Sequence, residues 1–299
     1  MGEEVKQKSI THLCTEIVAM NMHGTRLYSV LFELQAQYEA YLPATMGHQI
    51  HAMFLQLVAR ANPALSVRLH DEPGYRPFTL SPLFGAVSCG NSVALSPGQT
   101  YHVRVTLLDG GNLWDYLSTL LLETGPLEIR LGEASFTVTR LLSTAAADTT
   151  GWAERTSWEE LVATPMRHII TMSFASPTAF NISGKFFALF PEPPLVWESL
   201  VRSWNSYAPD PLKIEKQALQ DMLWHKVIVT GCSLSTHTLH YPKYTQKGFA
   251  GTCTYALQED GACAAQLARL AAFARFAGVG YKTTMGMGQV RMEETDERE

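Results

Sequence analysis

The sequence has few cysteines, and none of them forms a pair suited to zinc binding or redox chemistry. Its five cysteines are scattered along the 299 residues without any C-x-x-C arrangement: Cys14, Cys89, Cys232, Cys253 and Cys263. An odd number at such spacing argues against both a disulfide framework and a cysteine-based zinc site. We expect most of these side chains to be buried as small apolar residues.

The sequence also lacks any apolar run of the roughly 18 residues that span a bilayer. Residues 1–8 are polar and charged, unlike the apolar centre of a secretory signal. Charged residues make up only 17% of the chain and hydrophobic residues 46%, which argues against disorder and allows one large domain or two ordinary ones. We therefore expect a soluble protein of the cytoplasm that does not associate with membranes.

The net charge of −5 is unevenly distributed. Residues 1–164 carry 10 basic and 16 acidic side chains, whereas residues 165–292 carry 12 basic and 7 acidic ones. Residues 293–299 add five acids and one arginine, as expected for a solvated tail. A basic second half in an acidic protein is a weak indication of a polyanionic partner.

Strand and helix patterns alternate through the first half. Residues 47–61 place apolar side chains on one face, which predicts an amphipathic helix that ends at Asn62-Pro63. A turn at residues 109–112 precedes a second helix. The remaining expected elements are strands at 27–34, 78–83, 101–107 and 135–142, with the second helix at 113–123. The resulting order, β-α-β-β-α-β, is that of a ferredoxin-like domain.

The second half repeats this order less clearly, so the predicted fold class is α+β with two tandem ferredoxin-like domains. Its expected elements are strands at 168–174, 226–230, 250–256 and 287–292, and helices around 197–204 and 262–276. The predicted organisation is an N-terminal extension at 1–26, domains at 27–150 and 151–292, and an acidic tail at 293–299. The small, polar stretch 143–151 is interpreted as the linker.

A glycine-rich run at 278–290 follows the last predicted helix. It is not a Rossmann fingerprint, because Thr283 occupies the position of the third glycine, and the run follows a helix rather than a strand. It is not a P-loop either, because Tyr281 precedes Lys282 where that motif needs glycine.

Two interpretations of this run remain. In the first, glycines let the backbone approach RNA, free N–H groups and basic or hydroxyl side chains contact phosphates, and an aromatic ring stacks on a base. The residues assigned to RNA on this basis are Gly278, Gly280, Tyr281, Lys282, Thr283, Thr284, Gly286 and Gly288. In the second, the run is a turn that packs a helix against a sheet.

A near-terminal glycine-rich loop preceded by the helical sequence at 271–277 resembles the motif of the RAMP superfamily. Within it, residues 248–290 are similar to the CRISPR repeat-processing nucleases, the sixth family of CRISPR-associated proteins. The first half contains motifs in the same order as this family. They are Leu42-Pro43, the helix from Gly47, Asn62-Pro63, Leu69-His70 and residues 78–83. The resemblance covers most of residues 27–292.

This resemblance implies an antiviral-defence endoribonuclease that cleaves CRISPR repeat RNA without metal or cofactor, leaving a 2′,3′-cyclic phosphate and a 5′-hydroxyl. The reaction needs a base for the 2′-hydroxyl proton, an acid for the leaving oxygen and a cation for the phosphorane charge. The alternative is an inert RAMP subunit that only holds guide RNA. Repeat RNA is thus the expected partner, with other subunits of a CRISPR effector complex as further candidates.

The resemblance places the catalytic histidine at His70, with Arg76 as a contact to the scissile phosphate. His51 is the second candidate, on the first helix three residues after His48, so the two share a side. The tyrosine that some relatives use in this helix has no counterpart, because Leu55 stands there. The second proton carrier therefore stays open.

A further RNA-binding segment is predicted at 240–249, where basic and aromatic residues mix in a hairpin. Its assigned contacts are Lys243, Tyr244 and Lys247, and a solvated turn is the alternative. His237 and His240 have no further ligands at metal spacing, so no metal site is expected. His70-Asp71 does not indicate an HD-type phosphohydrolase, because the chain is too rich in strands.

Overall fold

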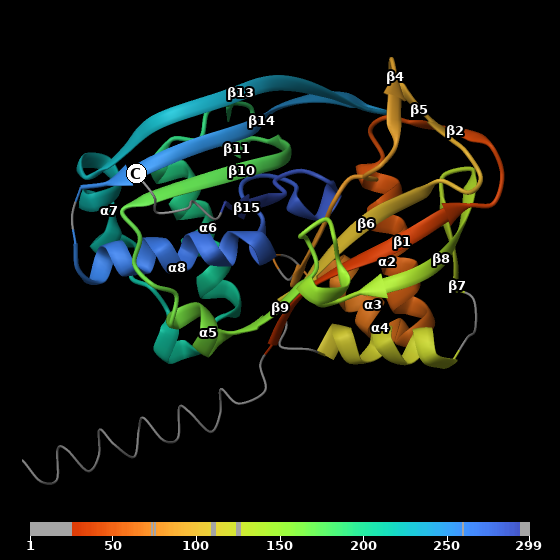
Figure 1. Ribbon diagram of the computed structural model, residues 1–299, viewed down its shortest axis with the longest axis horizontal. Coiled ribbons are helices and arrows are strands. Elements are labelled where there is room, and N and C mark those ends of the chain that lie inside the picture. Colours follow the sequence, from red (N-terminus) through yellow and green to blue (C-terminus); the bar gives the residue numbers. More distant parts are fainter. Residues whose placement is uncertain are drawn as a thin grey trace, which may run out of the picture.

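The computed structural model describes residues 26–293, apart from 73, 75, 109–111, 124–126 and 259. The predicted extension as far as residue 25, most of the turn at 109–112, and the tail beyond Glu293 lie outside the described residues. The described chain forms two halves that lie side by side, each with a principal antiparallel sheet and packed helices (Figure 1).

The first half is ferredoxin-like, as predicted. Its sheet has the order β3-β6-β1-β8-β7, in which β3, β6, β1 and β8 are the four predicted strands in ferredoxin-like order. Helices α2 and α4 pack on this sheet and share its core of buried aliphatic and aromatic side chains. The predicted elements have the following bounds: β1 Arg26–Ala36, α2 Gly47–Ala61, β3 Phe78–Leu80, β6 Thr100–Leu107, α4 Asn112–Glu123 and β8 Ala134–Leu142.

Several elements of this half were not predicted. They are β2 Ala40–Pro43, α3 Pro63–Asp71, β4 Val87–Cys89, β5 Ser92–Leu95, β7 Leu127–Leu131, η1 Ala145–Ala147 and β9 Glu154–Ser157. The spacer expected after the first helix is itself helix α3. The Asn62 side chain accepts a hydrogen bond from the Leu65 amide at 3.0 Å, and Pro63 fills the first turn. The same dipeptide thus ends one helix and caps the next.

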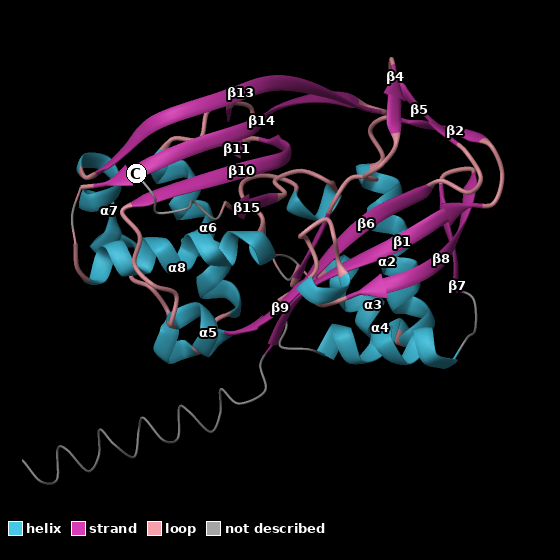
Figure 2. Ribbon diagram, viewed as in Figure 1, coloured by secondary structure: helices cyan, strands magenta, loops and turns pink. Residues whose placement is uncertain are grey.

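The second half is also ferredoxin-like, with sheet order β13-β14-β10-β15. Helices α5, α6, α7 and α8 lie together on one side of this sheet, and within the described residues the other side carries no helix (Figure 2). The bounds are α5 Trp158–Val162, β10 Ile169–Thr178, β11 Phe180–Asn181, β12 Phe187–Ala188, α6 Pro193–Tyr207, η2 Asp210–Leu212, α7 Lys216–His225, β13 Val227–Tyr241, β14 Tyr244–Leu257, α8 Ala262–Ala277, η3 Thr283–Met285 and β15 Val290–Met292.

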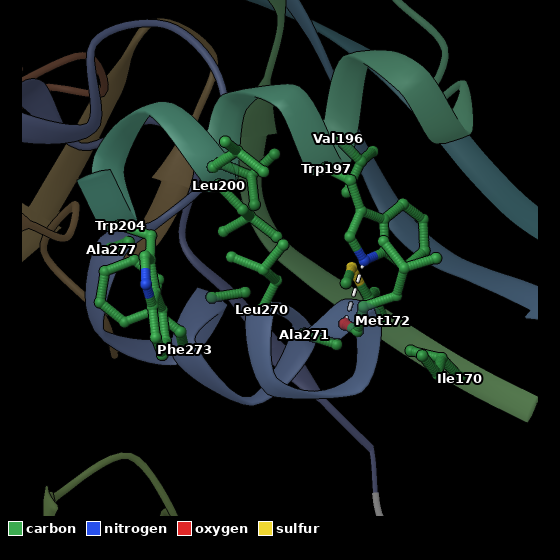
Figure 3. Close-up of a cluster of buried hydrophobic side chains, with 14 of the residues drawn as sticks. Ile170, Met172, Val196, Trp197, Leu200, Trp204, Leu270, Ala271, Phe273 and Ala277 are labelled. Atoms are coloured by element: carbon green, nitrogen blue, oxygen red, sulfur yellow. Dashed lines mark hydrogen bonds between the residues drawn. The ribbon is translucent and has the colours of Figure 1, made fainter. Parts of the chain in front are cut away.

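Helices α6 and α8 pack directly on each other over the sheet (Figure 3). Trp197 and Trp204 of α6 are buried, and the Trp197 indole N–H donates to the Leu267 carbonyl at 3.0 Å. A buried aromatic of this size contributes roughly 2–3 kcal/mol of transfer free energy. Because these tryptophans face α8, the opposite face of α6 points away from the core.

The segment 143–151, interpreted as the linker, is held by hydrogen bonds. Burial raises the pKa of Asp148, but the hydrogen bonds that its carboxylate accepts from the amides of Thr150, Trp152 and Ala153 outweigh this, so the pKa is below its usual value. Strand β9 then pairs with β1, so the first sheet extends to Ser157, beyond residue 150. The sequence is small and polar here because the segment satisfies a buried carboxylate.

A buried arginine joins the two halves. Arg104 of β6 is inaccessible to solvent and donates to Ser29 Oγ at 2.8 Å, to Gln289 Oε1 at 2.7 Å and to the Arg275 carbonyl. Its guanidinium lies 4.7 Å from the centroid of the Trp152 ring. Gln289 belongs to the glycine-rich run, so this contact fixes that run against the first half.

The β13–β14 hairpin is much longer than the two short strands predicted from its ends. It arches from the second half across to the first, as its blue ribbon shows in Figure 1. Near the turn, the His240 amide donates to Thr45 Oγ1 at 3.0 Å. The hairpin tip therefore lies beside the start of α2.

Candidate active site at the junction of the two halves

The N-terminus of α2 lies against η3, the short helix within the glycine-rich run, and Gly47 makes this possible. A Cβ atom at residue 47 would lie 2.1 Å from the Met285 carbonyl oxygen. Only glycine allows the two backbones to approach so closely. Glycine inside a helix costs up to about 1 kcal/mol relative to alanine, which makes its presence here a signal that the sequence interpretation missed.

One turn after Gly47, His51 reaches the same loop. His51 Nδ1 lies 3.0 Å from the Thr284 carbonyl oxygen, a contact between residues 233 positions apart. A carbonyl only accepts, so Nδ1 carries the proton and donates it. In the neutral ring this leaves Nε2 with a lone pair, the form required of a general base.

The pKa of His51 is lowered from its usual value of 6.5. Partial burial is the main cause, and the positive charges of Arg76, His70 and His48 act in the same direction, while the Thr284 contact opposes them. Desolvation and nearby cations both disfavour a charged imidazole. His51 is therefore neutral at pH 7.

His70, the first candidate from the sequence, has a different environment. It lies in the last turn of α3, its side chain is 71% exposed, and its Nδ1 lies 2.6 Å from Asp71 Oδ1. It is near enough to His51 to affect that residue's pKa. The two histidines thus belong to one cluster, but of the two it is His51 that contacts the glycine-rich run.

Arg76 is held at the end of α3 by backbone carbonyls. Its guanidinium donates to the carbonyls of His70 and Glu72, each at 2.8 Å, and its amide donates to the Tyr207 hydroxyl at 3.1 Å. Helix α3 is what brings Arg76 back toward α2. The contact of Arg76 with the scissile phosphate stays a prediction.

Lys282 is surrounded by aromatic rings. Its Nζ lies 4.6 Å from the Tyr241 centroid, 4.0 Å from Tyr244 and 5.2 Å from Tyr281, and it donates to the Tyr244 hydroxyl. The Tyr244 hydroxyl also lies 3.4 Å from His48 Nε2. The hairpin tip, the glycine-rich run and α2 thus meet around one lysine.

The glycine-rich run does not present the free amides expected of a phosphate cradle. The amides of its four glycines all donate within the protein, to the Ala274 carbonyl, Ser199 Oγ, the Leu80 carbonyl and the Pro177 carbonyl; these glycines are Gly278, Gly280, Gly286 and Gly288. At Gly280, φ is +86° and a Cβ would lie 2.5 Å from the Ala179 carbonyl oxygen. These four amides therefore serve internal packing, and the assignment of the four glycines to RNA stays a prediction.

The side chains that were assigned to RNA remain accessible. Lys243, Tyr244 and Lys247 are exposed at the hairpin tip, and those from Tyr281 to Thr284 are partly exposed beside the histidine cluster. His237 contacts Ser235 Oγ at 2.8 Å. Within the described ranges, no group of three or more His, Cys, Asp or Glu side chains is arranged to hold a metal ion. Likewise, no described helix is long and apolar enough to cross a membrane.

Replacing Gly47 with alanine is expected to reduce both stability and activity. The gain in helix propensity is at most about 1 kcal/mol, and a backbone clash at 2.1 Å outweighs it because neither backbone can move freely. We expect the His51–Thr284 contact to be lost, with a lower denaturant midpoint and slower RNA cleavage. Gly231→Ala is the control, since its Cβ would meet only Thr254 Cβ at 4.0 Å. An unchanged Gly47→Ala protein would contradict this account.

Tandem ferredoxin-like halves with a histidine cluster at their junction define a RAMP-type protein. A family model described as the CRISPR Cas6 N-terminal domain matches residues 27–163, and one described as CRISPR-associated endoribonuclease Cas6 matches residues 172–290. The chain belongs to the Cas6 family. The resemblance inferred from the sequence is confirmed.

Similar solved structures agree. Cas6 from Thermus thermophilus has a TM-score of 0.70 and 30% identity, with 89% of this chain and 98% of that chain covered. A Cas6 product complex reaches a TM-score of 0.75 and 31% identity over 90% of this chain and 100% of that chain. A RAMP protein that binds different RNA substrates, at 14% identity, a TM-score of 0.56, and coverage of 89% of this chain and 100% of that chain, supports the fold alone.

Curated relatives match over shorter stretches. The CRISPR-associated endoribonuclease Cas6 of Streptococcus thermophilus is 28% identical over 121 residues, 40% of this chain and 49% of that protein. The one from Mycobacterium tuberculosis is 29% identical over 141 residues, 46% of this chain and 43% of that protein. The chain thus matches about half the length of these relatives.

Proposed function

We propose that this protein cleaves CRISPR repeat RNA as a metal-independent endoribonuclease, with His51 as the general base. The observation that carries the assignment is the contact of His51 Nδ1 with the Thr284 carbonyl, which leaves Nε2 available in a neutral ring. Relatives solved as product and substrate-mimic complexes, and one as a histidine-to-alanine mutant, support the reaction class.

In the proposed reaction, His51 takes the proton of the 2′-hydroxyl at the cleavage site. The 2′ oxygen forms a bond to the phosphorus, the bond to the 5′ oxygen breaks, and that oxygen receives a proton. The products are a 2′,3′-cyclic phosphate and a 5′-hydroxyl. Arg76 and Lys282 are the cations assigned to the phosphorane charge, because both lie beside the histidine cluster.

Tyr244 is the proposed second proton carrier. Leu55 has no ionisable group, whereas the Tyr244 hydroxyl accepts from Lys282 and lies 3.4 Å from His48 Nε2. A hydroxyl next to an ammonium group is a suitable proton donor. His70 and His48 are assigned to positions around the site rather than to proton transfer.

The RNA is proposed to bind across both halves. The first half supplies the general base His51, and the second half supplies the glycine-rich run. Lys243 and Lys247 contact phosphates, and Tyr281 with Thr283 and Thr284 contacts the nucleotides near the cut. A cytoplasmic location is part of this proposal, because the transcript is found there. Attachment to other subunits of an effector complex would follow cleavage.

The proposal is tested by incubating the protein with its own repeat RNA in EDTA and mapping the ends of the products. A single cut with a cyclic phosphate and a 5′-hydroxyl is the expected result. Binding without cleavage would contradict it and leave the inert-subunit alternative. Cleavage that requires added metal would contradict the mechanism.

The cleavage rate is expected to fall at acidic pH with a midpoint below 6.5. Only neutral His51 accepts a proton, and its pKa lies below 6.5 because burial disfavours the charged ring. The rate should therefore reach half of its plateau value at a pH below 6.5. Single-turnover rates at saturating protein measure this, with RNA binding followed at each pH as the control. A midpoint at or above 6.5 would argue against His51 as the base.

A further inference from the structure

Two adjoining cavities lie along α6 on one side of the glycine-rich run. One, of about 170 Å³, lies between α6, the run and the segment around Arg76. The other, of about 370 Å³, lies between α6, Tyr281 and the β11–β12 hairpin. Arg202 and Gly280 line both cavities. We call the two together the α6 groove.

The floor of the α6 groove is a polar stripe of helix α6. Ser199, Arg202, Ser203 and Ser206 follow one another at i, i+3, i+4 and i+7, so they share one face of the helix. The apolar face of α6, with Trp197, Leu200 and Trp204, is buried against α8 (Figure 3). The polar stripe therefore points away from α8. Small hydroxyl side chains leave space and offer hydrogen bonds.

The groove is positively charged. Arg202 is exposed, and its guanidinium has no hydrogen bond or ion pair with any residue in the described ranges. Arg76 lies at one end of the groove, and the turn of the β11–β12 hairpin, a hairpin that lines the second cavity, carries the exposed Lys185. The carboxylate of Glu198 also lines it, but its Oε2 is paired with Lys216 Nζ at 2.8 Å. An unpaired guanidinium between two cavities complements a phosphate.

Apolar and aromatic side chains stand beside these charges. Phe186 is 72% exposed and Ile182 is 56% exposed, both in the β11–β12 hairpin. Tyr281 lines the second cavity, with its ring 5.2 Å from that of Phe187. Exposed rings next to cations form the combination that binds single strands, since bases stack on rings while phosphates contact charges. A duplex hides the faces of its bases, so it would not use these rings.

We propose that the α6 groove binds a single-stranded flank of the repeat RNA, adjoining the cleavage site at Arg76. This inference rests on the proposed function. The groove starts next to Thr283 and Arg76, so a strand leaving the cut enters it directly. Lys243 and Tyr244 lie in a different element, at the tip of the β13–β14 hairpin. Arg202 contacts a phosphate, and Phe186 stacks on a base.

The test measures RNA affinity by fluorescence anisotropy, with a 2′-deoxy nucleotide at the cut to prevent cleavage. Three RNAs are compared: the whole repeat, the repeat without its 5′ flank and the repeat without its 3′ flank. For the whole repeat, Arg202→Ala and Phe186→Ala are each expected to weaken binding by roughly 5- to 30-fold. Arg202→Ala should also reduce the slope of log affinity against log salt by about 1.

If one flank occupies the groove, removing that flank should make the RNA affinities of wild type, Arg202→Ala and Phe186→Ala equal. Removing the other flank should leave the difference in affinity between wild type and the two variants unchanged. Arg130→Ala and Trp224→Ala are matched controls, since both side chains are exposed on other elements. Wild-type affinity of both groove variants for the whole repeat would overturn the inference. So would an equal loss on all three RNAs. In both cases cleavage by the wild type would leave the proposed function standing, whereas a wild type that binds no repeat RNA would remove both.

Discussion

Replacing His51 with alanine is expected to slow cleavage of the repeat RNA by about 10²–10⁴-fold, the usual contribution of a general base. The imidazole is partly buried, neutral and held by the Thr284 carbonyl, as a general base requires. Single-turnover cleavage in EDTA measures the effect. Affinity for uncleavable RNA should change by less than about 3-fold, since the side chain that is lost is neutral and the phosphate charges are contacted by other residues.

His70→Ala is the matched control for this experiment. His70 is exposed and pairs with Asp71, and it affects His51 only through its charge. We expect His70→Ala to keep most of the activity. The reverse outcome, in which His70→Ala is inactive and His51→Ala is active, would restore the assignment made from the sequence. Loss of activity in both variants would indicate that two histidines share the proton transfers.

Replacing Arg104 with leucine is expected to lower the free energy of unfolding by about 3–5 kcal/mol, as when one partner of a buried polar network is removed. The leucine would leave Ser29 Oγ, Gln289 Oε1 and the Arg275 carbonyl without their donor. Removing a charge from the interior offsets part of this loss. Burial lowers the pKa of Arg104 to about 9, so the group is still charged at neutral pH.

The measurement for Arg104 is urea unfolding, with the midpoint and the slope compared between variants. Arg130→Leu is the control, since Arg130 is an exposed arginine of the same sheet and should change stability by less than about 0.5 kcal/mol. Equal free energies of unfolding for Arg104→Leu and wild type would contradict this prediction. They would mean that the desolvation of the guanidinium cancels the stabilisation from its hydrogen bonds. Because Gln289 lies in the glycine-rich run, we also expect slower cleavage in Arg104→Leu.

The order of the elements could be predicted because it depends on local periodicity. The helix at 47–61 was predicted to the residue, and the β-α-β-β-α-β order was correct in the first half. Helix α3 was missed because Asn62-Pro63 was interpreted only as a stop, although Asn and Pro also start helices. Strand β9 was missed because its partner is β1, more than a hundred residues earlier.

The glycine-rich run shows where sequence interpretation reached its limit. Its composition is compatible with RNA contact and with internal packing. The choice depends on what lies next to each amide, and those neighbours come from β3, β10, α6 and α8. The four glycine amides are used inside the protein, which the composition of the run does not reveal.

By itself, the sequence determined the fold class, the family and the two regions that meet at the site. It ranked His70 above His51 because motif order along the chain was the only evidence for choosing. The proposal of His51 as the base rests on the tertiary structure, since its burial, its contact with Thr284 and the nearby Arg76 arise only when segments far apart in the sequence come together. A pKa depends on burial and on the charges nearby in the folded structure, and the order of residues along the chain does not give these.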